Sequence, residues 1–93
     1  MAAIAGVTAT IAIVTTVDAR GLACPLPLTM AKRRMAELSA GETLVVLATD
    51  PEASIDLGAW AEEEGHWFTE RQLQGWREFE VQKAEKQTNS RQN

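Results

Sequence analysis

The stretch that decides the fold of this chain is Arg20–Pro27, which reads RGLACPLP. It follows a β-branched segment and precedes a helix-like pattern. We therefore expect a strand, a tight turn with Gly21 at positive φ, and a helix that begins at Pro25. The stretch also holds Cys24, the only cysteine among the 93 residues. The sequence thus predicts a single thiol presented in a turn at the start of a helix.

Hydrophobic patterns on either side of this turn predict six elements in the order β-α-β-α-β-β. Strands are expected at residues 11–17, 42–49, 66–72 and 76–82, and helices at 25–38 and 51–64. The run 42–49 is almost continuously apolar, which is typical of a central strand parallel to its neighbour. Because such a crossover is right-handed, both helices should cover one face of a four-stranded mixed sheet. The predicted fold is an α/β two-layer sandwich.

The details of the two helices follow from caps and apolar stripes. The first helix should bury Leu28, Ala31, Met35 and Leu38, and the second Ala53, Leu57, Trp60 and Ala61. For the second helix we expect Asp50 as N-cap, a kink or break at Gly58 and a cap at Gly65. The sheet face opposite the helices should stay partly open, with Trp67 or Trp76 on it as a candidate contact surface.

The composition narrows the possible functions. A chain of this length forms one small domain, and its net charge of −4 argues against nucleic acid as a direct partner. A lone cysteine cannot form an internal disulfide and favours the reducing cytoplasm. With one histidine and one cysteine we expect no metal site, and no cofactor is indicated.

Both ends of the chain differ from its middle. Residues 1–10 are rich in Ala, Thr and Gly, which predicts a flexible leader. The folded domain is expected at residues 11–83, and the polar residues 84–93 are expected to form a disordered tail. A secretory signal would require a Lys or Arg ahead of its apolar run, but the first basic residue of this chain is Arg20. Four threonines interrupt the apolar run up to Val17, so membrane insertion is not expected.

The turn suggests how the thiol could be activated. With Cys24 as N-cap, Pro25 and Pro27 remove two amide donors, and the Leu26 N–H is expected to donate to the sulfur. The helix dipole and Arg20 across the turn should further favour a thiolate or a persulfide anion. These features predict a lowered pKa for Cys24.

Other interpretations of these residues stay open. Cys24 could be a small, buried and inert side chain. A cysteine enzyme would need a histidine base, but His66 is expected at the opposite edge of the layer, where its side chain makes a structural hydrogen bond. Lys32 and Arg33, with Arg34, form either a solvated helix face or a docking patch for an acidic partner.

The segment Asp18–Leu22, followed by Cys24–Pro27, resembles the signature of the TusA (SirA-like) sulfur-carrier family with its Cys-Pro-x-Pro motif. The resemblance extends over Val14–Lys83. Similar residues fall where the family places them at Gly41-Glu42, Asp50-Pro51, Asp56-Leu57, Trp60 and Gly65-His66.

This resemblance implies a cytoplasmic protein, monomeric when free, that carries sulfur as a persulfide on Cys24. The implied donors are a cysteine desulfurase or a rhodanese, and the acceptors belong to tRNA thiolation, molybdenum-cofactor supply or dissimilatory sulfur oxidation. Two alternatives remain: a sulfurtransferase that handles thiosulfate or polysulfide with a membrane transporter, and a regulatory binding module with an incidental cysteine. Two positions depart from the family, since Ala61 stands where some members have a second cysteine and Gly58 where proline is common.

Overall fold

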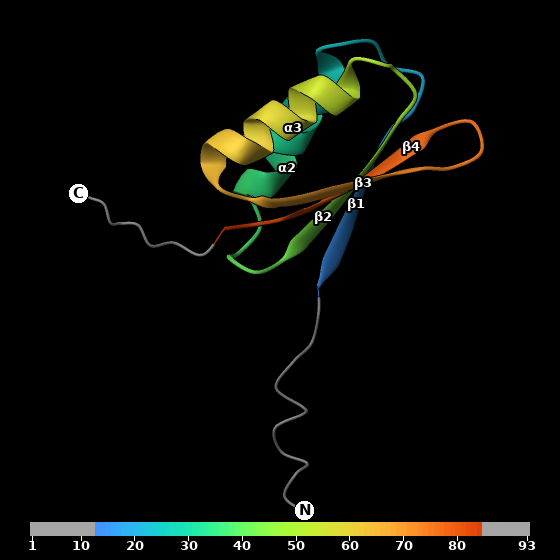
Figure 1. Cartoon of the computed structure of the whole chain (residues 1–93). Coiled ribbons are helices and arrows are strands. Elements are labelled where there is room, and N and C mark those ends of the chain that lie inside the picture. Colours follow the sequence, from blue (N-terminus) through green and yellow to red (C-terminus); the bar gives the residue numbers. More distant parts are fainter. Residues whose placement is uncertain (1–12, 85–93) are drawn as a thin grey trace, which may run out of the picture.

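The computed structural model describes residues 13–84. Its elements are β1 (Val14–Ala19), α2 (Leu26–Ala36), β2 (Thr43–Ala48), α3 (Ala53–Glu64), β3 (Trp67–Gln72) and β4 (Arg77–Gln82). The strands form one mixed sheet in the order β1-β2-β4-β3. Both helices lie on the same side of this sheet, so the predicted α/β two-layer sandwich is confirmed (Figure 1).

The strand β2 lies inside the sheet, as its apolar run predicted. It pairs in parallel with β1 and antiparallel with β4, so neither of its edges is free. Leu44 and Val46 have no exposed surface, and Val45 on the opposite face is only 8% exposed. Because β2 buries side chains on both of its faces, its sequence does not alternate between apolar and polar residues.

The core lies between the sheet and the helices. Val17, Val46 and Phe79 stand side by side across three strands, and the ring of Phe79 stacks on Phe68 with 5.9 Å between centroids. From α3 the core receives the four predicted residues. From α2 it receives Pro27, Ala31 and Met35, whereas Leu28 and Leu38 are only half-buried. The predicted stripe of α2 is therefore confirmed at its centre, while Leu28 and Leu38 at its ends pack against the core without being fully buried, and Pro27 is an additional buried residue.

Some predicted boundaries also change. The first strand extends to Ala19 because Asp18 and Ala19 pair with Leu47 and Ala48 of β2. Residues 11–12, the leader 1–10 and residues 85–93 lie outside the described residues. Ala84, assigned to the tail from sequence, is half-buried, and its amide donates to His66 Nδ1 at 3.0 Å. Within residues 13–84, no helix has the length and apolar character needed to cross a membrane.

The open face of the sheet carries an exposed aromatic side chain. Trp67 is 61% exposed and precedes Phe68, which packs against the core. Because neighbouring side chains of a strand point to opposite faces, Trp67 lies on the face away from the helices. The exposed tryptophan expected on this face is confirmed for Trp67, whereas Trp76 is half-buried.

Two predictions about the glycines of α3, at Gly58 and Gly65, can be compared with the structure. The expected kink at Gly58 is wrong, since α3 is continuous from Ala53 to Glu64. A β-carbon at Gly58 would lie 3.5 Å from the Phe68 ring, an ordinary van der Waals distance. The cap at Gly65 is confirmed: it has a φ of 78°, and its amide donates to the carbonyl of Glu62.

Alanine at these two glycines is expected to have opposite effects on stability. Gly58→Ala should raise the free energy of unfolding by about 0.5–1 kcal/mol, because alanine is the better helix former and the space is available. Gly65→Ala should lower it by about 1 kcal/mol, because a β-carbon disfavours positive φ. Urea denaturation of both variants measures these changes. Two shifts of the same sign would contradict this account of α3.

Candidate functional site

The candidate site is the loop from Arg20 to Pro25, which joins β1 to α2. Parallel strands end at the same edge of a sheet, so this loop meets the residues that follow β2. The Gly21 amide donates to Thr49 Oγ1 at 2.9 Å, and the Cys24 amide donates to Asp50 Oδ2 at 2.8 Å. Gly21 has a φ of 83°, as predicted. Two hydrogen bonds thus hold the cysteine loop against the β2–α3 connection.

Cys24 is solvent-exposed, which removes the interpretation of a buried inert side chain. Its Sγ–H donates to Asp56 Oδ2 of α3 at 2.9 Å. This hydrogen bond raises the pKa of Cys24 from 9.0 to about 11, with smaller contributions from desolvation and from the nearby carboxylates of Asp56, Glu52 and Asp50. Asp56 had been noted only as a position similar to the family, and its contact with the thiol was not predicted.

The predicted activation of Cys24 was therefore wrong in its geometry and its sign. Pro25, and not Cys24, occupies the N-cap position of α2, and its carbonyl accepts the Thr29 amide at 3.0 Å. The Leu26 amide donates to the Ala23 carbonyl at 2.9 Å instead of to the sulfur. Asp56 of α3, with the carboxylates of Glu52 and Asp50 before it, raises the pKa of Cys24, which is opposite to the predicted lowering.

Arg20 was expected to stabilise an anion at Cys24, but its guanidinium forms an ion pair with Asp18 instead. Its guanidinium donates to both carboxylate oxygens of Asp18, at 2.9 and 2.8 Å, and lies 4.7 Å from the ring centroid of Trp76. The ion pair lowers the pKa of Asp18 to about 2. Among residues 13–84, no hydrogen bond joins Arg20 to Cys24.

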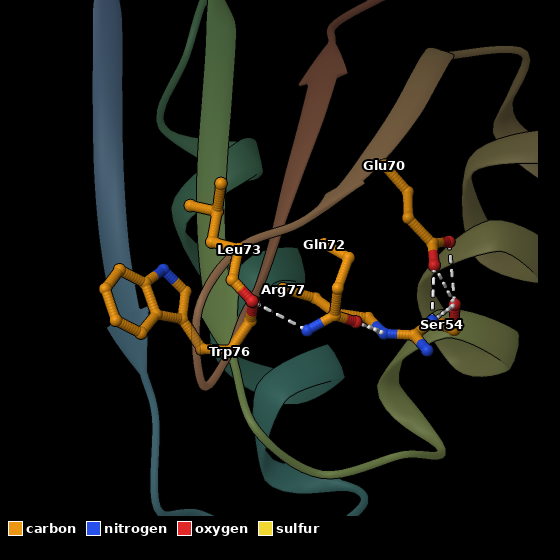
Figure 2. A network of polar contacts seen from close by, with 6 residues as sticks. All are labelled: Ser54, Glu70, Gln72, Leu73, Trp76 and Arg77. Carbon is orange, nitrogen blue, oxygen red and sulfur yellow. Dashed lines mark hydrogen bonds and ion pairs between the residues drawn. The ribbon is translucent and has the colours of Figure 1, made fainter.

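A polar network holds Trp76 in this position (Figure 2). Gln72 Nε2 donates to the carbonyl of Trp76 at 3.2 Å, and Arg77 Nε donates to Gln72 Oε1 at 2.7 Å. Arg77 also pairs with Glu70 at 2.6 Å, and Glu70 accepts the hydroxyl of Ser54 from α3 at 2.7 Å. The hairpin turn is thus tied to α3 on one side and, through Trp76, to the cysteine loop on the other.

Asp50 has two structural roles at the site. Its Oδ1 accepts the Glu52 amide at 2.7 Å while its Oδ2 accepts the Cys24 amide, and these two bonds lower its pKa. The prediction that Asp50 is the N-cap was wrong, because α3 begins at Ala53 with Glu52 at the N-cap position. Asp50 instead links the start of α3 to the cysteine loop.

The remaining candidates lie away from the thiol. His66 precedes β3 at the other end of the sheet, packs against Trp60 with centroids 5.2 Å apart, and accepts the Ala84 amide. The predicted structural role of His66 is confirmed. Lys32 and Arg33 are exposed on α2. Across residues 13–84, no set of three or more histidine, cysteine, aspartate or glutamate side chains is arranged to hold a metal ion.

Comparison with known protein families shows which family this chain belongs to. The family model described as sulfurtransferase TusA matches residues 15–83. The chain belongs to the TusA family. Its sulfur-carrier relatives include TusA of Allochromatium vinosum, named a sulfur carrier protein, which is 41% identical over 58 residues, or 62% of this chain and 76% of that protein.

Further relatives differ in length. YrkI and YrkF of Bacillus subtilis are each 47% identical to this chain over 58 residues. The match spans 77% of YrkI but only 31% of YrkF, which is therefore much the longer protein. The crystal structure of a SirA-like protein from Desulfitobacterium hafniense has a TM-score of 0.69 and 31% identity, and the match covers 78% of this chain and all of that one.

Proposed function

We propose that this protein carries sulfane sulfur as a persulfide on Cys24 and passes it from a donor protein to an acceptor protein. The observation that carries the proposal is an exposed thiol on a loop fixed by Thr49 and Asp50, in a TusA-family domain. The relative from Allochromatium vinosum is named for sulfur carriage. The proposed donor is a cysteine desulfurase or a rhodanese, and the proposed pathways are tRNA thiolation, molybdenum-cofactor supply or dissimilatory sulfur oxidation.

The chemistry of loading is an exchange between sulfur atoms. Cys24 loses its proton and attacks the outer sulfur of the donor persulfide; the S–S bond of the donor breaks, and the donor cysteine leaves and takes up a proton. No net oxidation occurs. A thiol with a raised pKa is a weak nucleophile by itself. This favours a carrier completed by its partners over a stand-alone sulfurtransferase.

Mass spectrometry tests the proposal directly. The protein is incubated with a cysteine desulfurase and cysteine, and we expect the intact mass to increase by one sulfur atom in wild type and not in Cys24→Ser. Thiosulfate with a rhodanese tests the second class of donor. A sulfur gain that persists in Cys24→Ser, or no gain with either donor, would refute the proposal.

Lys32 and Arg33 are proposed to attract an acidic patch on the donor. Both are exposed on α2, and Arg33 lines a shallow hollow between α2 and β1 with Asp18 and Met30. Lys32→Glu and Arg33→Glu, made singly, should slow loading by roughly tenfold at low salt and less at high salt, because electrostatic steering is screened. Arg71→Glu on β3 is the control with the same charge change. Equal slowing by the control would argue against a docking patch.

A further inference from the structure

The hydrogen bond between Cys24 and Asp56 is not a consequence of burial. Cys24 is exposed, and α3 places Asp56 in its first turn, 32 residues further along the chain. A thiol in water has little need of a protein acceptor, so the 2.9 Å bond is not required to satisfy a buried group. The pair is a specific contact between the cysteine loop and α3 at the candidate site.

The charges that face the thiol have one sign. From the α3 side, the carboxylates of Asp50, Glu52 and Asp56 act on Cys24. From the α2 side, the first turn carries no acidic residue, and Leu26 and the next two residues are uncharged. The cation of the cysteine loop itself, Arg20, is paired with Asp18. Within the described residues the thiol is thus surrounded by acceptors and negative charge.

Only the unloaded form of Cys24 can make this contact. In the thiol, Sγ carries the hydrogen that Asp56 accepts. In a persulfide, Sγ is bonded to the outer sulfur instead, and that sulfur lies about 2 Å further out. Asp56 would then face the lone pairs of Sγ, and the Sγ–H hydrogen bond is lost; in the persulfide anion the outer sulfur carries no hydrogen that could replace it.

We propose that Asp56 is a positioning residue that stabilises the thiol form of Cys24 over the persulfide and so favours release of the carried sulfur. This inference rests on the proposed function. In the release step, an acceptor thiol loses its proton and attacks the outer sulfur, and the bond between that sulfur and Cys24 Sγ breaks. Cys24 takes up a proton and becomes a thiol again, and its Sγ–H forms the hydrogen bond to Asp56. The products are an acceptor persulfide and the thiol form of Cys24.

The transfer equilibrium tests this role. Wild type, Asp56→Asn and Asp56→Ala are loaded and equilibrated with reduced glutathione as the acceptor, and the loaded fraction is read by mass spectrometry. We expect the equilibrium constant for release to fall roughly three- to tenfold in both variants, since a hydrogen bond at an exposed site is worth less than a buried one. Glu63→Gln also removes one negative charge from α3, but at an exposed position, and it should leave the equilibrium constant for release unchanged. An equal constant in wild type and Asp56→Ala, the variant that removes the acceptor oxygen, would overturn the inference.

A second readout needs no sulfur. At pH 8, unloaded Asp56→Asn should react with iodoacetamide roughly tenfold faster than wild type, because its larger thiolate fraction outweighs its lower intrinsic nucleophilicity. Far-UV circular dichroism checks that the variant is folded. An unchanged alkylation rate refutes the role of Asp56 even if Cys24 loads, whereas a wild type that takes up no sulfur refutes the proposed function whatever the alkylation shows.

Discussion

Phe79→Ala is expected to remove a large part of the stability of the domain. Phe79 has no exposed surface, lies on the inner strand β4 beside Val46 of β2, and stacks on Phe68. Truncating a buried phenylalanine costs about 3–5 kcal/mol, the lost transfer free energy plus the cavity left behind. Small domains have only about 5–15 kcal/mol in total. Urea denaturation should therefore show a midpoint far below that of wild type.

Trp67→Ala is the matched control for this prediction. It also removes a large aromatic side chain from the sheet, but Trp67 is 61% exposed, on β3 at the sheet edge. Its free energy of unfolding should stay within about 0.5 kcal/mol of wild type. If Phe79→Ala proved as mild as this control, the core would not lie where the structure has it.

Much of this fold could be predicted because local patterns and the tertiary structure agree. The apolar run of β2, the alternation of β4 and the stripe of α3 each bury the expected side chains. The order β1-β2-β4-β3 was not predicted, because alternation within a hairpin does not say which of its strands pairs with β2. Phe79 and Val81, both fully buried, mark β4 as the inner strand, whereas most of β3 is exposed.

The site was predicted less well than the fold. The location of Cys24 followed from its own turn, but its environment depends on α3, which is distant in sequence. The prediction considered the helix dipole and the amides of one element, whereas the carboxylate of Asp56 comes from another. A signal was present: Asp50, Glu52 and Asp56 follow β2, and the ends of parallel β1 and β2 meet at one edge. The same reasoning had correctly excluded His66.

The alkylation rate of wild-type Cys24 is expected to rise about 500-fold between pH 8 and pH 11. With a pKa of about 11, roughly 0.1% of the thiol is ionised at pH 8 and about half at pH 11. An ordinary thiol, with a pKa of 9.0, would gain only about tenfold over the same range. The rate constant with iodoacetamide, measured at intervals of half a pH unit, separates these cases.

The urea-unfolded chain provides the reference, since its thiol lacks the contact with Asp56 and should titrate near the ordinary pKa of 9.0. Because the thiol pKa is higher in the folded state, its contribution to stability is present below pH 9 and is lost as the pH rises toward 11. Circular dichroism at each pH must therefore show that the wild type is still folded. A rate that is already level at pH 8 would mean that the thiolate forms without a partner, as the helix dipole alone predicted. A rate that climbs to pH 11 would mean that a partner must supply the charge that stabilises the thiolate, because the side chains that act on Cys24 from α3 and from the connection before it are carboxylates.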